Sequence, residues 1–317
     1  MLKFGICTLA QLRAESDADV PWVKQKEVAI DLYNEVLELA DADRLAERVL
    51  LRFMDERGVY KRTYTGRFQE FDEEALGIVM QTLPQDIPWI VHDHGVSDGR
   101  TATDFFQRLA AAKADVQYHA LDYDPEVTLI RDGKIRVALG SRSRKMLQIV
   151  RPPFVFNMMN RDSYRRYPLN HPARLWVRAQ AIKAVKKHEE GILPSAALLL
   201  FCPRARRLAA GDPRFHLMKH SILEPFRHAL PARIVRVMNL LNPDGFTSAE
   251  MLTAVRNVHD SLDEKGLFLT GSNQQQSTTV DGAIYQKDGA GFRLIRQSGA
   301  GSPADPFIRE MRRRSSG

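Results

Sequence analysis

The chain has 317 residues, which is enough for two domains at the usual ~150 residues each, or for one large α/β domain with extensions. With 44% hydrophobic, 27% charged and 8% aromatic residues it has the composition of a folded protein, which excludes disordered, collagen-like and low-complexity classes. Lys and Arg outnumber Asp and Glu by 46 to 39, and the net charge of +7 permits an anionic partner without requiring one.

Cysteine content and apolar runs bear on the compartment. Two cysteines, Cys7 and Cys202, cannot build a disulfide framework in a chain of this length, so we expect reduced core thiols in a cytoplasmic protein. Every apolar run falls far short of the ~20 residues that cross a bilayer. His92 and His94 flank Asp93 without a third ligand nearby in the sequence, and we predict no metal site.

The first part of the chain has helical periodicity. Apolar residues recur at spacings of three and four over residues 28–39 and again over residues 45–53. A third helix is predicted over residues 72–83 and stops at Pro84. We therefore expect residues 1–84 to form a helical N-terminal cap ahead of the main domain.

A buried parallel sheet is expected to begin at residue 87. Residues 87–91 are a short, mostly apolar run typical of a strand that is buried on both faces. A helix is predicted over residues 101–112, and a second strand over residues 116–121 ends at Asp122. Together these segments predict a βαβ unit.

Residues 127–156 have a different pattern, with short β-rich runs around an Asp132-Gly133 turn. This pattern predicts a hairpin or small meander, which we treat as an insertion at about residues 125–172. A basic helix is predicted over residues 174–187, and its Arg and Lys side chains offer a surface for an anionic partner.

Strands and helices alternate again from residue 197. Strands are predicted at residues 197–201, 215–218, 233–238 and 266–270, helices at 204–210 and 248–262, and a closing strand pair across Asp288-Gly289.

These elements predict an α/β fold, a doubly wound, Rossmann-like, mostly parallel sheet with an antiparallel C-terminal strand pair, an N-terminal helical cap and an inserted β meander. We expect the Rossmann-like domain at residues 85–298 and a disordered basic tail at residues 299–317.

The most informative segment is residues 89–101, where a buried strand is followed by an acid, three small residues and a helix. Gly95 permits a turn or close backbone approach, and the amides of the helix start near Gly99 can hold an anion. A P-loop is disfavoured because the glycine spacing is too short and Arg100 replaces the lysine. A dinucleotide is disfavoured because Ser97 stands where a second glycine would pack against pyrophosphate.

The pattern Asp93-x-Gly95-x-Ser97-x-Gly99 resembles the first motif of class I S-adenosylmethionine (SAM)-dependent methyltransferases, which often read Asp-x-Gly-x-Gly/Ser-x-Gly. The resemblance covers residues 87–295 and implies SAM as the cofactor and methyl transfer as the activity. It also implies that Gly95, Ser97 and Gly99 hold the methionine portion, while Asp93 stabilises its amino group or the loop. SAM has no pyrophosphate, so a side chain at Ser97 is tolerable.

A second match is Asp122, which ends the next strand where family members carry an acid for the ribose hydroxyls. A carboxylate suits this role because it can accept from two vicinal hydroxyls. Residues 197–201 are an alternative for the second strand, and Cys202 would then replace the acid. We favour Asp122.

Two further segments resemble the same family. Residues 236–246 resemble its fourth strand, including the branch related to chemotaxis-receptor methyltransferases, and place Asn239 at the carboxyl end of a central strand as the candidate catalytic residue. The alternative role of Asn239 is to cap its loop. Residues 218–225 resemble the adenine-binding motif, in which Ile222 would pack on the ring and Ser221 stands where an Asp is usual.

The predicted function is SAM-dependent methyl transfer to an unidentified acceptor. One alternative is a non-catalytic Rossmann-fold protein with a degenerate SAM pocket that acts through a partner. Another is an NAD(P)-dependent oxidoreductase. The sequence has no Asn-Pro-Pro-Tyr amino-methylating motif, so the acceptor stays open.

Overall fold

The structure is a computed structural model that describes residues 5–14, 26–61, 63–160, 167–226, 230–273 and 279–314. The chain divides into two compact units, each assembled from two separate segments. The meander unit combines Met1–Thr63 with Asp124–Pro203, and the Rossmann-like unit combines Tyr64–Tyr123 with Arg204–Gly317.

These boundaries differ from the expected cap at residues 1–84 and insertion at 125–172. Residues up to 63 join the inserted segment, which continues to residue 203, because the apolar faces of the early helices and of the meander sheet bury each other in one cluster. Helical periodicity shows that a face will be buried, but not which surface will cover it.

The Rossmann-like unit is built on a seven-stranded sheet with the order β12-β11-β10-β9-β1-β2-β8. Its strands are β1 (Trp89–His94), β2 (Val116–Asp122), β8 (Phe215–Lys219), β9 (Ala232–Met238), β10 (Leu262–Ser272), β11 (Asp281–Asp288) and β12 (Gly291–Ser298).

Five of these strands are parallel to one another, namely β1, β2, β8, β9 and β10. The sheet ends with β11 and β12, which are antiparallel. Counted along the chain, the parallel strands have the spatial order 3-2-1-4-5, which is that of doubly wound folds with a switch point between β1 and β9. The predicted fold class is confirmed.

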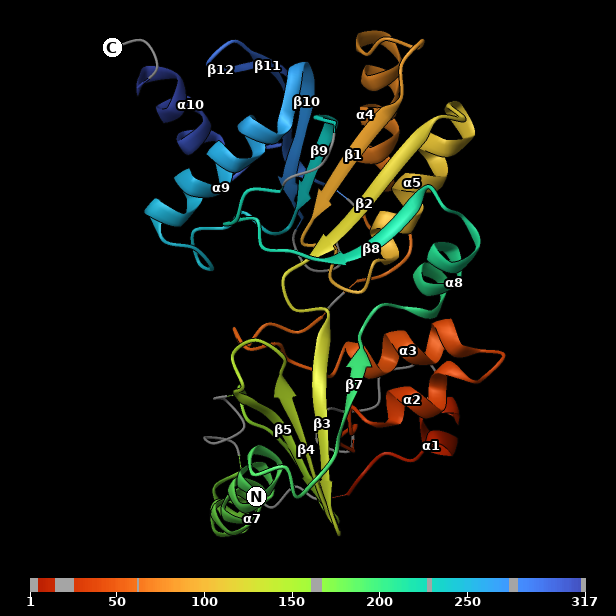
Figure 1. The fold of residues 1–317 in the computed structure, drawn as a ribbon, viewed down its shortest axis with the longest axis vertical. Coiled ribbons are helices and arrows are strands. Elements are labelled where there is room, and N and C mark those ends of the chain that lie inside the picture. The colour runs from red at the N-terminus through yellow and green to blue at the C-terminus, as the bar shows by residue number, and fades with distance from the viewer. Residues whose placement is uncertain are drawn as a thin grey trace. The chain divides into compact units, whose positions relative to one another are not determined.

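Helices cover both faces of this sheet (Figure 1). α5 (Arg100–Ala112) packs Phe105 and Phe106 against Tyr118 of β2, and α4 (Gln69–Thr82) and α8 (Pro203–Gly211) lie on the same side. α9 (Ser248–Ser261) packs on the opposite face and begins with a capping box between Thr247 and Glu250, which satisfies backbone amides of its first turn.

The expected disorder from residue 299 is wrong for most of that segment. α10 (Asp305–Arg314) is helical, and Ile308 and Met311 are buried in the cluster that also contains residues of α9. The arginine run of residues 312–314 suggested a solvated tail, but apolar side chains four positions and one position before the run anchor the helix. Residues 315–317 lie outside the described residues.

The meander unit has a five-stranded antiparallel sheet with the order β6-β5-β4-β3-β7. Its elements are α1 (Leu9–Ala14), α2 (Leu32–Leu37), α3 (Ala42–Leu50), β3 (Glu126–Asp132), β4 (Ile135–Gly140), β5 (Met146–Arg151), β6 (Phe154–Asn157), η2 (Pro168–Asn170), α7 (His171–Glu189) and β7 (Ser195–Leu199).

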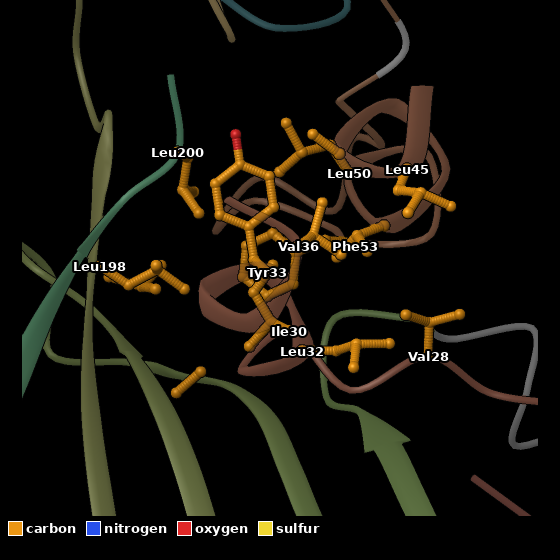
Figure 2. Close-up of a cluster of buried hydrophobic side chains, with 14 of the residues drawn as sticks. Val28, Ile30, Leu32, Tyr33, Val36, Leu45, Leu50, Phe53, Leu198 and Leu200 are labelled. Carbon is orange, nitrogen blue, oxygen red and sulfur yellow. The ribbon is translucent and has the colours of Figure 1, made fainter. Parts of the chain in front are cut away.

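The core of this unit lies between the sheet and the three early helices. Tyr33 and Val36 of α2 pack in one cluster with Phe53 and with Leu198 and Leu200 from β7 and the residues after it (Figure 2). The Tyr33 hydroxyl also donates a hydrogen bond to the Phe201 carbonyl at 2.8 Å. On the other face of the sheet, Val177, Ala181 and Ala184 of α7 pack against the strands.

The strand expected at residues 197–201 is β7, and it pairs with β3 in the meander sheet rather than with the parallel sheet. The second parallel strand is therefore β2, so Asp122 and not Cys202 occupies the end of that strand. Cys202 and Cys7 are both buried and neither forms a disulfide, as expected. No helix in the described part of the chain combines the length and apolar character needed to span a bilayer.

The basic helix predicted over residues 174–187 is part of α7. Arg174 does not belong to a solvated basic face, because it is buried with its guanidinium over the Phe156 ring. Lys186 and Lys187 are exposed but pair with Glu190 at 3.7 Å and Asp132 at 2.7 Å. Contact with an anionic partner stays a prediction for the remaining exposed cations.

Candidate functional site at the carboxyl edge of the parallel sheet

The glycine loop, residues 95–99, connects the buried strand β1 to α5. Three of its residues have left-handed backbones, Gly95 at φ +74°, Ser97 at +58° and Gly99 at +78°. A Cβ at Gly95 would lie 2.8 Å from the Leu240 side chain, so the close approach predicted at Gly95 is to a neighbouring loop of the protein. Gly99 occupies the N-cap position of α5.

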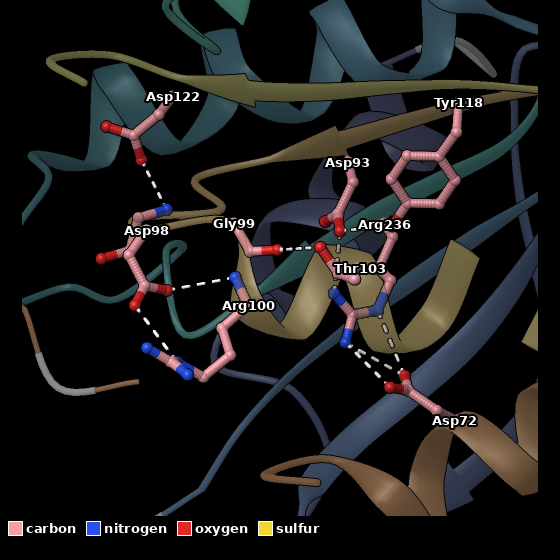
Figure 3. A network of polar contacts seen from close by, with 10 residues as sticks. Asp72, Asp93, Asp98, Gly99, Arg100, Thr103, Tyr118, Asp122 and Arg236 are labelled. Carbon is pink, nitrogen blue, oxygen red and sulfur yellow. Dashed lines mark hydrogen bonds and ion pairs between the residues drawn. The ribbon is translucent and has the colours of Figure 1, made fainter. Parts of the chain in front are cut away.

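Asp122 ties this loop to the end of β2. The Ser97 amide donates to Asp122 Oδ2 at 2.7 Å (Figure 3). The amides of Gly95 and Val96 donate to the Leu121 carbonyl at 2.7 and 3.2 Å. A left-handed serine costs about 1–2 kcal/mol, and the bond to a carboxylate offsets part of that cost. The structure thus brings Ser97 and Asp122 together, and their predicted contacts with the cofactor stay a prediction.

Arg100, at the position of the P-loop lysine, does not face a ligand. Its guanidinium lies 3.4 Å from the Asp98 carboxylate, and both side chains are buried. Its amide donates to the other oxygen of Asp98 at 3.1 Å. A cation held in this way cannot reach a phosphate, in agreement with the absence of a P-loop pattern.

Asp93 points to the α4–α5 face of the sheet and not to the carboxyl edge. Its Oδ2 accepts from the Tyr118 hydroxyl at 2.6 Å and from Arg236 Nη1 at 2.9 Å. Arg236 also donates from Nη2 to both oxygens of Asp72, at 3.0 and 3.1 Å (Figure 3). All four side chains are buried, and the guanidinium lies between the rings of Phe68 and Phe105. The carboxylate of Asp93 is therefore committed to the core.

The electrostatics of this network follow from one cation shared by two acids. Burial raises the pKa of Asp72 to about 6, although Arg236 opposes the change. Burial also raises the pKa of Asp93. Burial alone would lower the pKa of Arg236, but the charges of Asp72 and Asp93 outweigh it and hold the guanidinium protonated.

Asp72 should make stability depend on pH in a defined direction. Its pKa is higher in the folded state than the unfolded value of 3.8, so its stabilising contribution is complete below pH 3.8 and is lost as the pH rises through about 6. Asp72→Asn removes this dependence. Between pH 4 and 7 the unfolding free energy of the wild type should fall by up to about 3 kcal/mol relative to the variant, measured by urea denaturation. A constant difference between the two proteins would contradict the assignment.

Asn239 follows β9 with a left-handed backbone at φ +55° and is exposed at the carboxyl edge, where it was predicted to lie. Its amide pairs with Asn273, which follows β10: Nδ2 donates to Asn273 Oδ1 at 2.9 Å, and Oδ1 accepts from the Asn273 amide at 2.9 Å. Arg67 Nε donates to the same Asn273 Oδ1 at 3.0 Å. Asn239 thus joins the loops after β9 and β10, whereas the alternative considered for it was to cap its own loop, and its catalytic role stays a prediction.

Ser221 and Ile222 lie just after β8 and are both buried. Ser221 Oγ accepts from the Leu223 amide at 3.2 Å, which caps the turn. Ile222 belongs to the apolar cluster of Leu241, Phe246 and residues of α9. The side chain of Ile222 already packs against protein, and the adenine contacts stay a prediction.

Five histidines gather on the sheet face opposite Asp93. His92 and His94 of β1, His119 of β2, His216 of β8 and His220 form a set of ring contacts around Phe226, for example 4.6 Å between the His92 and Phe226 centroids. Burial, together with the neighbouring His220, lowers the pKa of His94 to about 3. The alternation of side chains along β1 predicts that His92 and His94 share a face. It does not predict that His119, His216 and His220 join them there.

Sequence reasoning missed four residues of this region: Arg67, Asp72, Arg236 and Asn273. Their partners lie more than 30 positions away, up to 206 in the case of Arg67 and Asn273, and no local motif links them. One signal was present, because Arg236 interrupts an apolar strand and a charge there requires a buried partner.

Comparisons with known proteins give structural likenesses only. No protein-family model matches the chain, and no curated protein does. The solved structures that it resembles include methyltransferases.

One is the N-methyltransferase NodS from Bradyrhizobium japonicum WM9 in complex with S-adenosyl-L-homocysteine, at 12% identity and TM-score 0.32, covering 76% of this chain and 71% of that chain. Another is the glycopeptide N-methyltransferase MtfA complexed with SAM, at 12% identity and TM-score 0.31, covering 74% and 67%. A third is the CMeT domain of the citrinin polyketide synthase, at 14% identity and TM-score 0.29, covering 76% of this chain but only 38% of that chain.

Proposed function

We propose that this chain binds SAM at the carboxyl edge of the Rossmann-like sheet and transfers its methyl group to an acceptor. The observation that carries the proposal is the Ser97–Asp122 bond of 2.7 Å. It places an acid at the end of the second parallel strand beside a glycine loop that enters a helix, next to the switch point where open α/β sheets bind ligands.

The residues at this edge fit SAM in part. Asp122 is an acceptor for ribose hydroxyls, and the amides at the start of α5, after Gly99, suit a carboxylate. Ser97 would obstruct a pyrophosphate, which SAM lacks. Asp93 makes no such contact in this proposal. It holds the end of β1, and with it the glycine loop, through Arg236 and Tyr118.

When bound, SAM would supply a methyl group that is activated by its sulfonium sulfur. Transfer of that methyl would leave S-adenosylhomocysteine as the second product. The chain's contribution is then orientation, because methyl transfer needs the acceptor in line with the methyl and demands no fixed acid or base. Asn239 and Asn273 keep the loops after β9 and β10 in register at the edge.

Calorimetric titration with SAM, S-adenosylhomocysteine and NAD(H) tests the proposal directly. We expect micromolar binding of the first two and none of NAD(H). Gly99→Asp should weaken SAM binding at least about 100-fold, since it adds bulk and a negative charge at the amides that would hold the SAM carboxylate. A matched control is Gly289→Asp, because Gly289 also has a left-handed backbone, at φ +59°, has open space around its Cβ position and lies outside the glycine loop.

The control variant should bind SAM like the wild type, with circular dichroism showing both variants folded. Equal affinity of Gly99→Asp and wild type would overturn the site. Asp122→Asn adds an independent arm, and a loss of about tenfold is expected from a weaker acceptor for ribose.

A non-catalytic, partner-binding role is the second candidate. The observations that favour it are the Leu240 side chain against Gly95 and the packing of Ile222 in the core. It predicts no SAM binding by the folded protein, whereas transfer of label from methyl-labelled SAM to any component of a cell extract would exclude it.

A further inference from the structure

α7 presents exposed apolar side chains that neither the meander core nor the proposed methyl transfer uses. Its inner face, with Val177, Ala181 and Ala184, packs on the meander sheet (Figure 1). On the opposite side Leu175 is 67% exposed and Ile182 is 50% exposed. These two residues are seven positions apart, so they lie on one face of the helix. Scattered exposed apolar residues are ordinary, whereas several along one helix mark a surface that binds a partner.

Two further large apolar side chains are exposed at the amino-terminal end of α7. Leu169, in the η2 turn directly before the helix, is 65% exposed, and Trp176 is 50% exposed. Arg151 of β5 holds the indole from one side, since its guanidinium lies 4.6 Å from the ring centre and its Nε donates to Gln180 Oε1 at 3.1 Å. The ring is therefore oriented before any partner binds. We refer to the following residues as the outer face: Leu169, Leu175, Trp176 and Ile182.

The charges of α7 are cationic along most of its length. No Asp or Glu occurs between residues 172 and 188. Arg178 and Lys183 are exposed in this stretch, and they form no ion pair with any residue in the described ranges. At about 100° per residue they fall on the two sides of the line from Leu175 to Ile182. The outer face thus lies between two cations without partners, which favours an anionic partner.

The acids of this helix lie at its carboxyl end. Glu189 contacts Arg144 at 4.0 Å, and Glu190 contacts Lys186 at 3.7 Å. Each of these acids therefore has a cation of its own and leaves the charges of Arg178 and Lys183 uncompensated. A second copy of the chain does not suit the outer face, because two such faces in contact would bring like charges together.

The residue types favour a lipid surface over a protein as the anionic partner. Lys is depleted in protein–protein interfaces, and Leu is under-represented among their hot spots. Anionic headgroups, in contrast, attract Lys and Arg, whose stems can lie along apolar surface. Trp is enriched at the boundary between headgroups and acyl chains. Trp176 beside Leu175, with Arg178 and Lys183 around them, is the combination that a bilayer surface binds.

We propose that α7 binds the surface of a lipid bilayer that contains anionic lipids. The outer face enters the boundary between headgroups and acyl chains, and Arg178 and Lys183 contact the anionic headgroups. The 19 residues of α7 extend for ~28 Å, so the helix contacts the bilayer along its length. The surface belongs to the meander unit, and the proposal stands independently of SAM binding by the Rossmann-like unit.

Cosedimentation of the full chain with vesicles tests the proposal. We expect at least about tenfold tighter binding to vesicles of equal parts phosphatidylcholine and phosphatidylglycerol than to phosphatidylcholine alone, because each cation near an anionic surface adds affinity. The fluorescence of Trp176 should shift to shorter wavelength on binding, since the indole leaves water. Trp176→Phe should remove the shift while the protein still sediments with the vesicles.

Three results of these measurements would overturn the proposal. One is equal binding to the two kinds of vesicle. Another is a fluorescence shift that persists in Trp176→Phe, which would place the contact elsewhere on the chain. The third is a folded wild type that stays in solution with the anionic vesicles, which would make a protein the partner of the outer face.

An apolar variant and a charge variant test the two parts of the surface. Leu175→Ser should weaken binding about tenfold, because it removes apolar area that enters the bilayer. Leu294→Ser is its matched control and should bind like the wild type, since Leu294 is also exposed but lies in β12. Arg178→Gln combined with Lys183→Gln should weaken binding to the anionic vesicles about 30-fold and leave binding to phosphatidylcholine unchanged.

A second double variant separates a contact at α7 from an effect of net charge. Lys134→Gln combined with Arg256→Gln removes the same two charges at exposed positions outside α7. Its binding to the anionic vesicles should stay within about threefold of the wild type. Equal losses in the two double variants would contradict the proposal, because the net charge of the chain would then explain the binding. SAM affinity should be unchanged in all of these variants.

Discussion

Arg236→Met should lower the free energy of unfolding by about 3–5 kcal/mol at pH 7, because it removes the only side-chain cation that Asp72 and Asp93 contact in the described network and leaves two buried carboxylates. The methionine fills most of the same volume, so the loss reports charge and not a cavity. Guanidinium denaturation monitored by tryptophan fluorescence measures it.

Arg233→Met is the matched control on the same strand. Its partner Asp263 is 31% exposed and Arg233 itself 24%, so solvent screens the pair and the expected loss is below about 1 kcal/mol. If Arg236→Met does not fold, Arg236→Lys retains a charge but loses the paired bonds to Asp72, and should give an intermediate loss. Similar losses for Arg236→Met and Arg233→Met would contradict the network as a major source of stability.

The wild type should also lose stability in acid through His94, and His94→Phe should suppress that loss. The unfolded histidine binds a proton below pH 6.5, whereas burial and the neighbouring His220 hold the pKa of the folded one at about 3. The contribution of His94 is therefore complete above pH 6.5 and is lost as the pH falls. Between pH 7 and 4 the wild type should lose about 3 kcal/mol more than His94→Phe.

His171→Phe serves as the control, since His171 is exposed in the first turn of α7. Its pH dependence should follow that of the wild type. The two groups change the free energy of unfolding in opposite directions as the pH changes. Falling pH lowers it through His94, whereas a rise in pH above about 4 lowers it through Asp72. If His94→Phe leaves the acid transition of the wild type unchanged, protonation of the histidine cluster is not its cause.

Local features of the candidate site could be predicted because short-range chemistry decides them. The apolar run that ends at Asp93 predicts a strand, and the glycines at 95 and 99 predict a loop with left-handed residues. The helical pattern after Gly99 predicts where the helix begins. These predictions do not depend on what packs around the segment. The same holds for the Thr247–Glu250 capping box, whose two bonds join residues three positions apart.

The role of a side chain depended on partners far along the chain. Asp93 was expected to stabilise either the cofactor's amino group or the loop, because its position in the motif is the same whether its side chain faces the edge or the core. Arg236 lies 143 positions away on the neighbouring strand and supplies a buried counter-charge. This counter-charge determines that the Asp93 side chain faces the core. Alternation along β1 predicts that Asp93 and His94 lie on opposite faces of the sheet. It does not predict which face carries the cation.

The sequence by itself determined the class of the protein: the order of strands and helices, the doubly wound sheet with its antiparallel end, and the loop that joins β1 to α5. Only the tertiary structure decided that β7 and the early helices belong to the meander unit, that α10 is ordered, and that the Asp31 side chain pairs with Arg136 instead of capping α2. The physical reason is that hydrogen bonds and side-chain periods act over a few residues, whereas an apolar face or a buried charge is satisfied by any complementary surface that the folded chain brings to it.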